Sequence, residues 1–120
     1  MSADLADGPT STSLGVSIAT DDEVVVLDVE GEIDLFSLSI LEQCLDAAIE
    51  QGTGDIVVDL ANVSFLDSSG LNLLLQGLRR LREDGRTLAV RNPVSGVEKV
   101  FTITGTLELL QRPRLAGSGG

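Results

Sequence analysis

Two serines beside an acidic residue, in the run Asp67-Ser68-Ser69-Gly70, are the residues best suited to chemistry in this 120-residue chain. Leucines recur at helical spacing from Leu71 onward, so the run stands where a helix should begin. A side-chain oxygen of Asp67 or Ser68 can cap that helix by accepting a hydrogen bond from a free N–H group of the first turn. Ser69 then falls at or just inside the helix start.

A phosphate ester on Ser69 would meet the unpaired N–H groups and the partial positive charge of a helix N-terminus. It would add about 1.5 to 2 negative charges at pH 7 beside Glu32, Asp34 and Asp67. That charge should repel an acidic or desolvated partner, so the loop has the properties of a charge switch. The simpler interpretation is that Asp67 and the serines only cap the helix, and the residues alone leave both interpretations open.

Composition excludes several kinds of chemistry. The chain has no His and one Cys, Cys44, which removes Ser-His-Asp and Cys-His catalysis, His-ligated metals and internal disulfides. Lys99 is the sole lysine, and no GxxxxGK[ST] phosphate-binding loop surrounds it. We therefore expect no catalytic residues, no metal and no cofactor.

Charge and hydropathy restrict the partners and the location. Eight Lys and Arg residues against 19 Asp and Glu residues give a net charge of −11, which disfavours nucleic acid and anionic lipid surfaces as partners. No apolar run approaches the roughly 20 residues of a membrane span, and no charged-then-apolar leader opens the sequence. We expect a cytoplasmic protein that binds neither nucleic acid nor membrane. Composition leaves the oligomeric state open.

The elements that must position these residues alternate between strands and helices. Apolar and β-branched runs predict strands at residues 14–18, 24–29, 56–60 and 87–90. Apolar residues at helical spacing predict helices at residues 36–50, 71–83 and 94–101. Residues 106–110 are predicted as a short strand or a last helical turn. An acidic turn at residues 20–23 joins the first two strands as an antiparallel hairpin.

This order predicts an α/β fold: a small mixed β-sheet of four to five strands, opened by an N-terminal hairpin, with three to four helices packed on it. Residues 14–112 form the domain, between flexible tails at residues 1–13 and 113–120. Loops 31–35 and 62–70 follow the second and third strands. Because the carboxyl ends of parallel strands share one edge of a sheet, both loops should lie together.

Three segments carry a family resemblance. The run Val57-Val58-Asp59-Leu60-Ala61-Asn62-Val63-Ser64-Phe65-Leu66-Asp67-Ser68-Ser69-Gly70-Leu71 resembles the signature of the STAS domain family, and more narrowly of the bacterial anti-sigma factor antagonists. Gly31-Glu32-Ile33-Asp34 matches the Gly-Glu-Leu/Ile-Asp loop of that family. Pro93-Val94, followed by Val97, Val100, Phe101, Thr104 and Gly105, resembles its C-terminal helix and Thr-Gly motif. Two departures are Thr106, where the family often has Leu, and Asn72, where a small or apolar residue is common.

The resemblance implies a partner-switching function. Such a protein binds an anti-sigma factor, usually a Ser/Thr kinase of the GHKL ATPase fold, and thereby frees a sigma factor. The kinase phosphorylates the second serine of the motif, here Ser69 with Ser68 as the alternate, and phosphorylation weakens binding. A PP2C-type phosphatase reverses it. The implied partner-binding residues are Glu32, Asp34, Leu66, Asp67, Ser68, Ser69, Gly70 and Asn72, with Leu73 as an alternative to Asn72.

Other functions stay open. One is a STAS scaffold without a switch, such as an accessory subunit of a stress-signalling assembly or of a lipid-transport ATPase; the presence of both Ser68 and Ser69 favours the switch. An enzyme with Ser69 as nucleophile ranks lower, because no His and no nearby Lys can act as its base.

Two further features are predicted to be structural. Cys44, on the apolar side of the first helix, is expected to be a buried and inert thiol. The arginines on and after the second helix are expected to form a solvated face; they are Arg79, Arg80, Arg82 and Arg86.

Overall fold

The computed structural model describes residues 14–111, so the expected tails at residues 1–13 and 113–120 lie outside the described residues. Eight elements follow one another: β1 (Leu14–Asp21), β2 (Val24–Ile33), α1 (Leu38–Gln51), β3 (Ile56–Leu66), α2 (Ser68–Glu83), β4 (Leu88–Arg91), α3 (Ser95–Thr104) and α4 (Leu107–Gln111). Residues 106–110, which the sequence predicts as either a short strand or a last helical turn, thus belong mostly to the helix α4. Gly105, with a φ of 75°, ends α3 before it.

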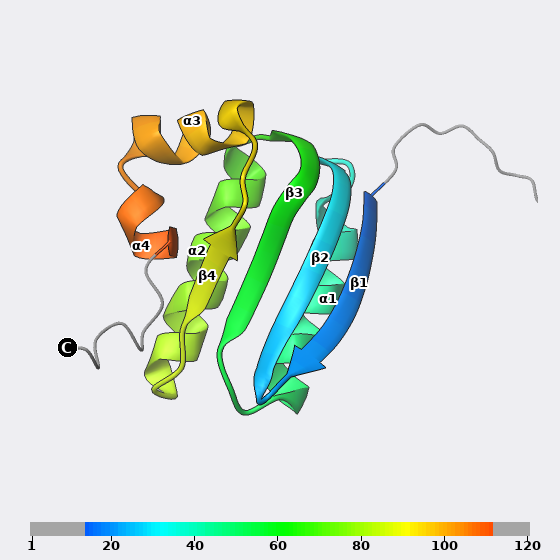
Figure 1. Cartoon of the computed structure of the whole chain (residues 1–120), viewed down its shortest axis with the longest axis vertical. Helices are drawn as coiled ribbons and strands as arrows, with labels where there is room; N and C mark the ends of the chain where they lie inside the picture. The colour runs from blue at the N-terminus through cyan, green and yellow to red at the C-terminus, as the bar shows by residue number, and fades with distance from the viewer. Residues whose placement is uncertain (1–13, 112–120) are drawn as a thin grey trace, which may run out of the picture.

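One four-stranded mixed sheet organises the molecule. The strand order is β1-β2-β3-β4, with β1 antiparallel to β2 and both other pairs parallel. Figure 1 shows α1 and α2 behind the sheet, and α3 and α4 towards its β4 side. The predicted α/β fold with its opening hairpin is confirmed: residues 14–111 form four strands, where four to five were expected, and four helices, where three to four were expected.

The core lies between the sheet and the two long helices. Alternate residues of β2 and β3 are buried, because a strand turns every second side chain towards the same face. Leucines at helical spacing on α1 and α2 meet them. Fully buried members include Leu27, Ile56, Leu60, Leu41, Leu45, Leu74 and Leu81.

The central strands extend further than the sequence predicts. β2 continues to Ile33 and β3 to Leu66, so most of the two expected loops is paired strand. Register shifts opposite Asp28–Glu30 and Gly31–Glu32 place extra residues in β3, which interrupt the alternation of buried and exposed residues in that strand. The period-2 pattern that predicts a strand is therefore lost in the second half of β3, although pairing with β2 continues. The carboxyl ends of β2 and β3 still meet at one edge of the sheet, at the top of Figure 1.

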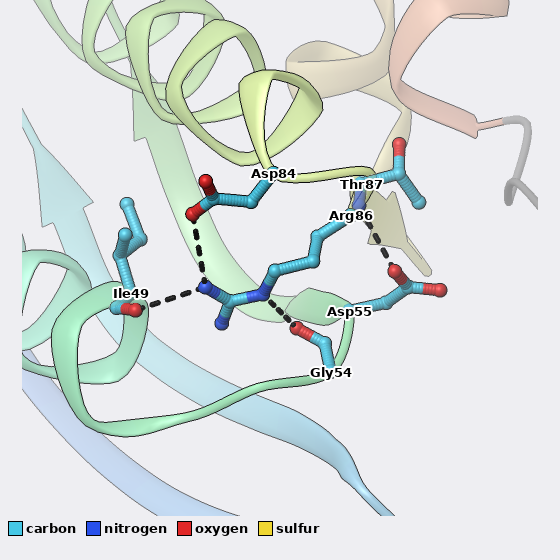
Figure 2. A network of polar contacts seen from close by, with 6 residues as sticks. All are labelled: Ile49, Gly54, Asp55, Asp84, Arg86 and Thr87. Carbon is cyan, nitrogen blue, oxygen red and sulfur yellow. Dashed lines mark hydrogen bonds and ion pairs between the residues drawn. The ribbon is translucent and has the colours of Figure 1, made fainter.

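Arg86 was wrongly grouped with the solvated arginines. The residue is buried, whereas Arg79, Arg80 and Arg82 are exposed. Figure 2 shows its guanidinium between the end of α1 and the start of β3: Nε donates to the carbonyl of Gly54 at 2.9 Å, and a terminal nitrogen donates to that of Ile49 at 3.0 Å. Arg86 therefore ties separate elements together.

Two smaller findings concern the helices. Cys44 is half-buried rather than fully buried. Within residues 14–111, no helix is long and apolar enough to cross a membrane.

Candidate functional site

Asp67 caps α2 and holds Ser69. Its backbone is extended, with φ −102° and ψ −176°, as an N-cap requires. One carboxylate oxygen accepts hydrogen bonds from the amides of Ser69 at 2.9 Å and Gly70 at 3.2 Å, and from the Ser69 hydroxyl at 2.5 Å. Asp67, rather than Ser68, is thus the cap, and Ser69 is the second residue of the helix.

The charge of Asp67 is stabilised by its surroundings. Partial burial acts to raise the pKa of its carboxyl. Hydrogen bonds from the Ser69 hydroxyl and from the amides of Gly70, Ser69 and Leu35 outweigh burial, so the net pKa is lowered. Asp67 is therefore ionised at neutral pH, and it is a weak base beside the Ser69 hydroxyl.

The end of β2 and the segment that follows it are hydrogen-bonded to Asp67. The amide of Asp67 donates to the carbonyl of Ile33 at 3.1 Å, and the Asp67 carboxylate accepts from the amide of Leu35. The two segments that the sequence placed on one sheet edge are thus hydrogen-bonded to each other.

A rigid turn, residues 34–37, leads into α1. The Asp34 carboxylate accepts from the amides of Phe36 and Ser37, both at 3.0 Å. The fully buried Ser37 hydroxyl donates to the carbonyl of Glu32 at 2.7 Å and accepts from the amide of Asp34 at 3.0 Å. Asp34 therefore shapes this turn, a role that the sequence analysis did not assign to it.

Some of the expected partner-binding residues are exposed at the surface, and others are buried beneath it. Exposed or half-exposed members are Glu32, Asp34, Asp67, Ser68, Ser69 and Asn72. Leu66 is 3% exposed, and Gly70 is buried, as is the alternative Leu73. A Cβ atom at Gly70 would lie 2.5 Å from Cγ2 of Ile33. Leu66 and Gly70 thus hold the two segments together from beneath, and neither presents a side chain to a partner.

Sequence reasoning missed three apolar side chains on this edge. Leu35 is 68% exposed, Phe36 86% and Phe65 49%. Phe65 pairs with Glu32 at the end of the sheet, and Leu35 donates to Asp67. A signal was available: Leu35 and Phe36 directly follow the Gly-Glu-Ile-Asp loop and stand outside the apolar stripe of the following helix.

The site's chemistry is that of a hydroxyl on a surface. Among residues 14–111, no group of three or more His, Cys, Asp or Glu side chains is arranged to hold a metal ion. Ser69 is half-exposed and directs its hydroxyl hydrogen to Asp67. An oxygen lone pair of Ser69 can therefore attack an electrophile that approaches from solvent.

The fold and this edge together define a family. Residues 16–111 match the family model described as "Mlab, STAS domain". The chain belongs to the STAS domain family.

Relatives of this chain include proteins named anti-sigma factor antagonists. The anti-sigma-B factor antagonist of Staphylococcus epidermidis is 33% identical over 98 residues, which cover 82% of this chain and 91% of the relative. The solved structure of the anti-sigma factor antagonist SpoIIAA in its unphosphorylated form is 30% identical, with a TM-score of 0.68 over 78% of this chain and 83% of that chain. Bacillus SpoIIAA has also been solved in a phosphorylated form, which is 28% identical with a TM-score of 0.64 over 81% and 88%.

Proposed function

We propose that this chain is an anti-sigma factor antagonist that is switched off by phosphorylation of Ser69. In this account it works in the cytoplasm, binds an anti-sigma factor that is a Ser/Thr kinase of the GHKL ATPase fold, and so frees a sigma factor. A PP2C-type phosphatase restores it. The observation that carries the proposal is the half-exposed Ser69 hydroxyl, held by the capping carboxylate of α2 on an edge with exposed apolar side chains.

The switch follows from charge. In the kinase step the Ser69 oxygen attacks the γ-phosphorus of ATP, the bond to ADP breaks, and the hydroxyl proton is released. Phosphorylated Ser69 no longer has the hydroxyl proton that Ser69 donates to Asp67. The phosphate carries about 1.5 to 2 negative charges at pH 7. These charges stand beside an ionised carboxylate, with Glu32 and Asp34 on the same edge. A partner that removes water from this surface, and whose cations are already paired with these acids, would leave the added charges unpaired, which is costly.

The unphosphorylated surface suits a partner. Ser69 and Asp67 satisfy each other, so covering them leaves few polar groups without a hydrogen bond. Glu32, Ser68 and Asn72 are exposed around them. Ser68 stays the alternate acceptor, since it is the first residue of α2 and more exposed than Ser69.

The test pairs the purified chain with ATP, Mg²⁺ and each candidate anti-sigma factor kinase of its own genome. Intact mass and peptide mass give the number and position of phosphates, and titration calorimetry gives affinity. We expect one phosphate on Ser69 from one kinase, and weaker binding afterwards. The Ser68→Ala variant should still be phosphorylated, whereas Ser69→Ala should bind and remain unmodified. Phosphate on Ser69→Ala would contradict the assignment.

The alternative is a STAS scaffold or accessory subunit in which the serine is not a switch. The same experiment separates the two, because a scaffold would take no phosphate and bind none of the kinases.

A further inference from the structure

The turn at residues 34–37 holds an aromatic side chain out into solvent. The chain has three Phe residues and no Tyr or Trp. Phe101 is fully buried, but Phe36 is 86% exposed, the highest value among the exposed large apolar residues of the part that the structure describes. Exposing this ring is unfavourable for the isolated chain, since burying it would remove apolar surface from water. Its position therefore calls for an explanation.

The backbone beneath Phe36 is rigid. Its amide donates to the Asp34 carboxylate at 3.0 Å, and the next residue, Ser37, is fully buried with its hydroxyl bonded to Glu32 and Asp34. The carbonyl of Ser37 accepts from the amide of Ile40 at 3.0 Å, which joins the turn to α1. A ring on such a support loses little conformational freedom when it binds, and this lowers the cost of association.

Phe36 is continuous with the edge that carries Ser69. Its neighbour Leu35 is 68% exposed and donates its amide to Asp67, the carboxylate that also holds the Ser69 hydroxyl. An apolar area, Leu35 and Phe36, thus adjoins the proposed phosphorylation site through one shared side chain.

The charge around the ring indicates what can cover it. Asp34 is part of the turn, and Glu32 and Asp67 are hydrogen-bonded to Ser37 and Leu35 within or beside it. The ion pairs of the described residues engage acids outside the turn; they are Arg80–Asp46, Arg86–Asp84 and Arg91–Asp59. A second copy of this chain would bring the same acidic groups against each other, which disfavours a symmetric contact. An apolar pocket with a rim of Lys or Arg would bury the ring and pair with the acids.

We infer that Phe36, supported by Leu35, is the apolar anchor with which this chain docks into a basic-rimmed hydrophobic pocket of its anti-sigma factor. The inference rests on the proposed function and adds to it the source of affinity: Ser69 controls the contact, and Phe36 supplies much of its strength. Buried aromatic anchors of this kind dominate many interfaces.

The test measures binding of variants to the kinase that binds the wild-type chain. Phe36→Ala should weaken binding about 30-fold or more, the loss that corresponds to a strong interface residue. Phe36→Leu should retain most of the affinity, because it keeps an apolar side chain of similar reach. The matched control is Leu109→Ala on α4, which removes an exposed apolar side chain from another element and should leave binding unchanged.

Charge reversal tests the rim. Glu32→Lys should weaken binding and reduce its dependence on salt, whereas Glu108→Lys on α4 should do neither. Circular dichroism of each variant should match the wild type, since all four side chains are exposed.

The outcomes distinguish the two proposals. If no kinase binds or phosphorylates the wild-type chain, the proposed function fails and this inference fails with it. If the wild type binds and Phe36→Ala binds equally well, the proposal that Phe36 anchors the contact is wrong, but the proposed regulation by Ser69 phosphorylation is unaffected. A wild-type dimer that Phe36→Ala converts to a monomer would assign the ring to a second copy and also overturn the inference.

Discussion

The two ends of the sheet use polar groups in opposite ways. At the Ser69 end, most side-chain hydrogen bonds join residues two to five positions apart, although the bond from the Leu35 amide to the Asp67 carboxylate joins distant segments, and the serine stays half-exposed. At the Arg86 end, shown in Figure 2, they join residues 32 to 37 positions apart, and the guanidinium is buried. The side-chain hydrogen bonds of the first end are therefore mostly local, whereas those of the second tie α1, β3 and β4 together.

This contrast separates function from stability. A chemical change at Ser69 alters one hydrogen bond and the charge of a surface, so the sheet can tolerate it. A change at Arg86 removes donors from the buried carbonyl of Ile49 and the partly buried carbonyl of Gly54, so it affects several elements of the fold. Substitutions at the two ends should therefore have different consequences.

The largest loss of stability is expected from Arg86→Ala. Removing the guanidinium leaves the carbonyls of Gly54 and Ile49 without these donors, and an unsatisfied buried group costs about 1 to 3 kcal/mol. We expect the free energy of unfolding to fall by roughly 3 kcal/mol in urea titrations. Arg82→Ala, on the exposed face of α2, should change it by less than about 0.5 kcal/mol. If both variants lowered the free energy of unfolding by the same amount, the stabilising role assigned to the Arg86 end of the sheet would be contradicted.

An intermediate effect is expected from Gly70→Ala, beneath the Ser69 surface. The new Cβ would lie 2.5 Å from Cγ2 of Ile33 and 3.1 Å from Cδ1 of Leu66, so packing must shift at a cost of about 1 to 3 kcal/mol. Gly96→Ala, in the first turn of α3, is the control, because no atom lies within 4 Å of its Cβ. Thermal unfolding should show a lower Tm for Gly70→Ala alone. An unchanged Tm would mean that the two segments are not held as closely as the structure indicates.

A smaller effect is expected from Asp67→Asn, and it should depend on pH. Because the folded-state pKa of Asp67 lies below the ordinary value of 3.8, ionisation favours the folded state. This contribution is complete above pH 3.8 and is lost as the pH falls through the lower folded-state pKa. At neutral pH the variant should be about 0.3 to 1 kcal/mol less stable, because Asn caps a helix as well as Asp does but lacks the negative charge that the helix N-terminus favours. The difference between variant and wild type should shrink in more acidic solution; a difference independent of pH would contradict this role of the charge.

The sequence predicts the fold and the Ser69 region because their signals are local. The apolar periods, the Gly105 stop and the capping run before Leu71 each lie within a few residues. The sequence could not place Arg86, whose partners are carbonyls more than 30 residues away. It also missed the end of β3, because extra residues in β3 shift its pairing with β2 before Phe65 meets Glu32. The exposure of Phe36 depends likewise on a turn whose hydrogen bonds are visible only in three dimensions.

The most direct test of the account is the site of phosphorylation and its effect on affinity. The chain, incubated with ATP, Mg²⁺ and its cognate anti-sigma factor kinase, should gain one phosphate, and peptide mass should assign it to Ser69. The modified chain should bind the kinase more weakly, while Ser69→Ala should bind as the wild type does and stay unmodified. A phosphate at any other residue, or a Ser69 phosphate that leaves affinity unchanged, would contradict the central claim.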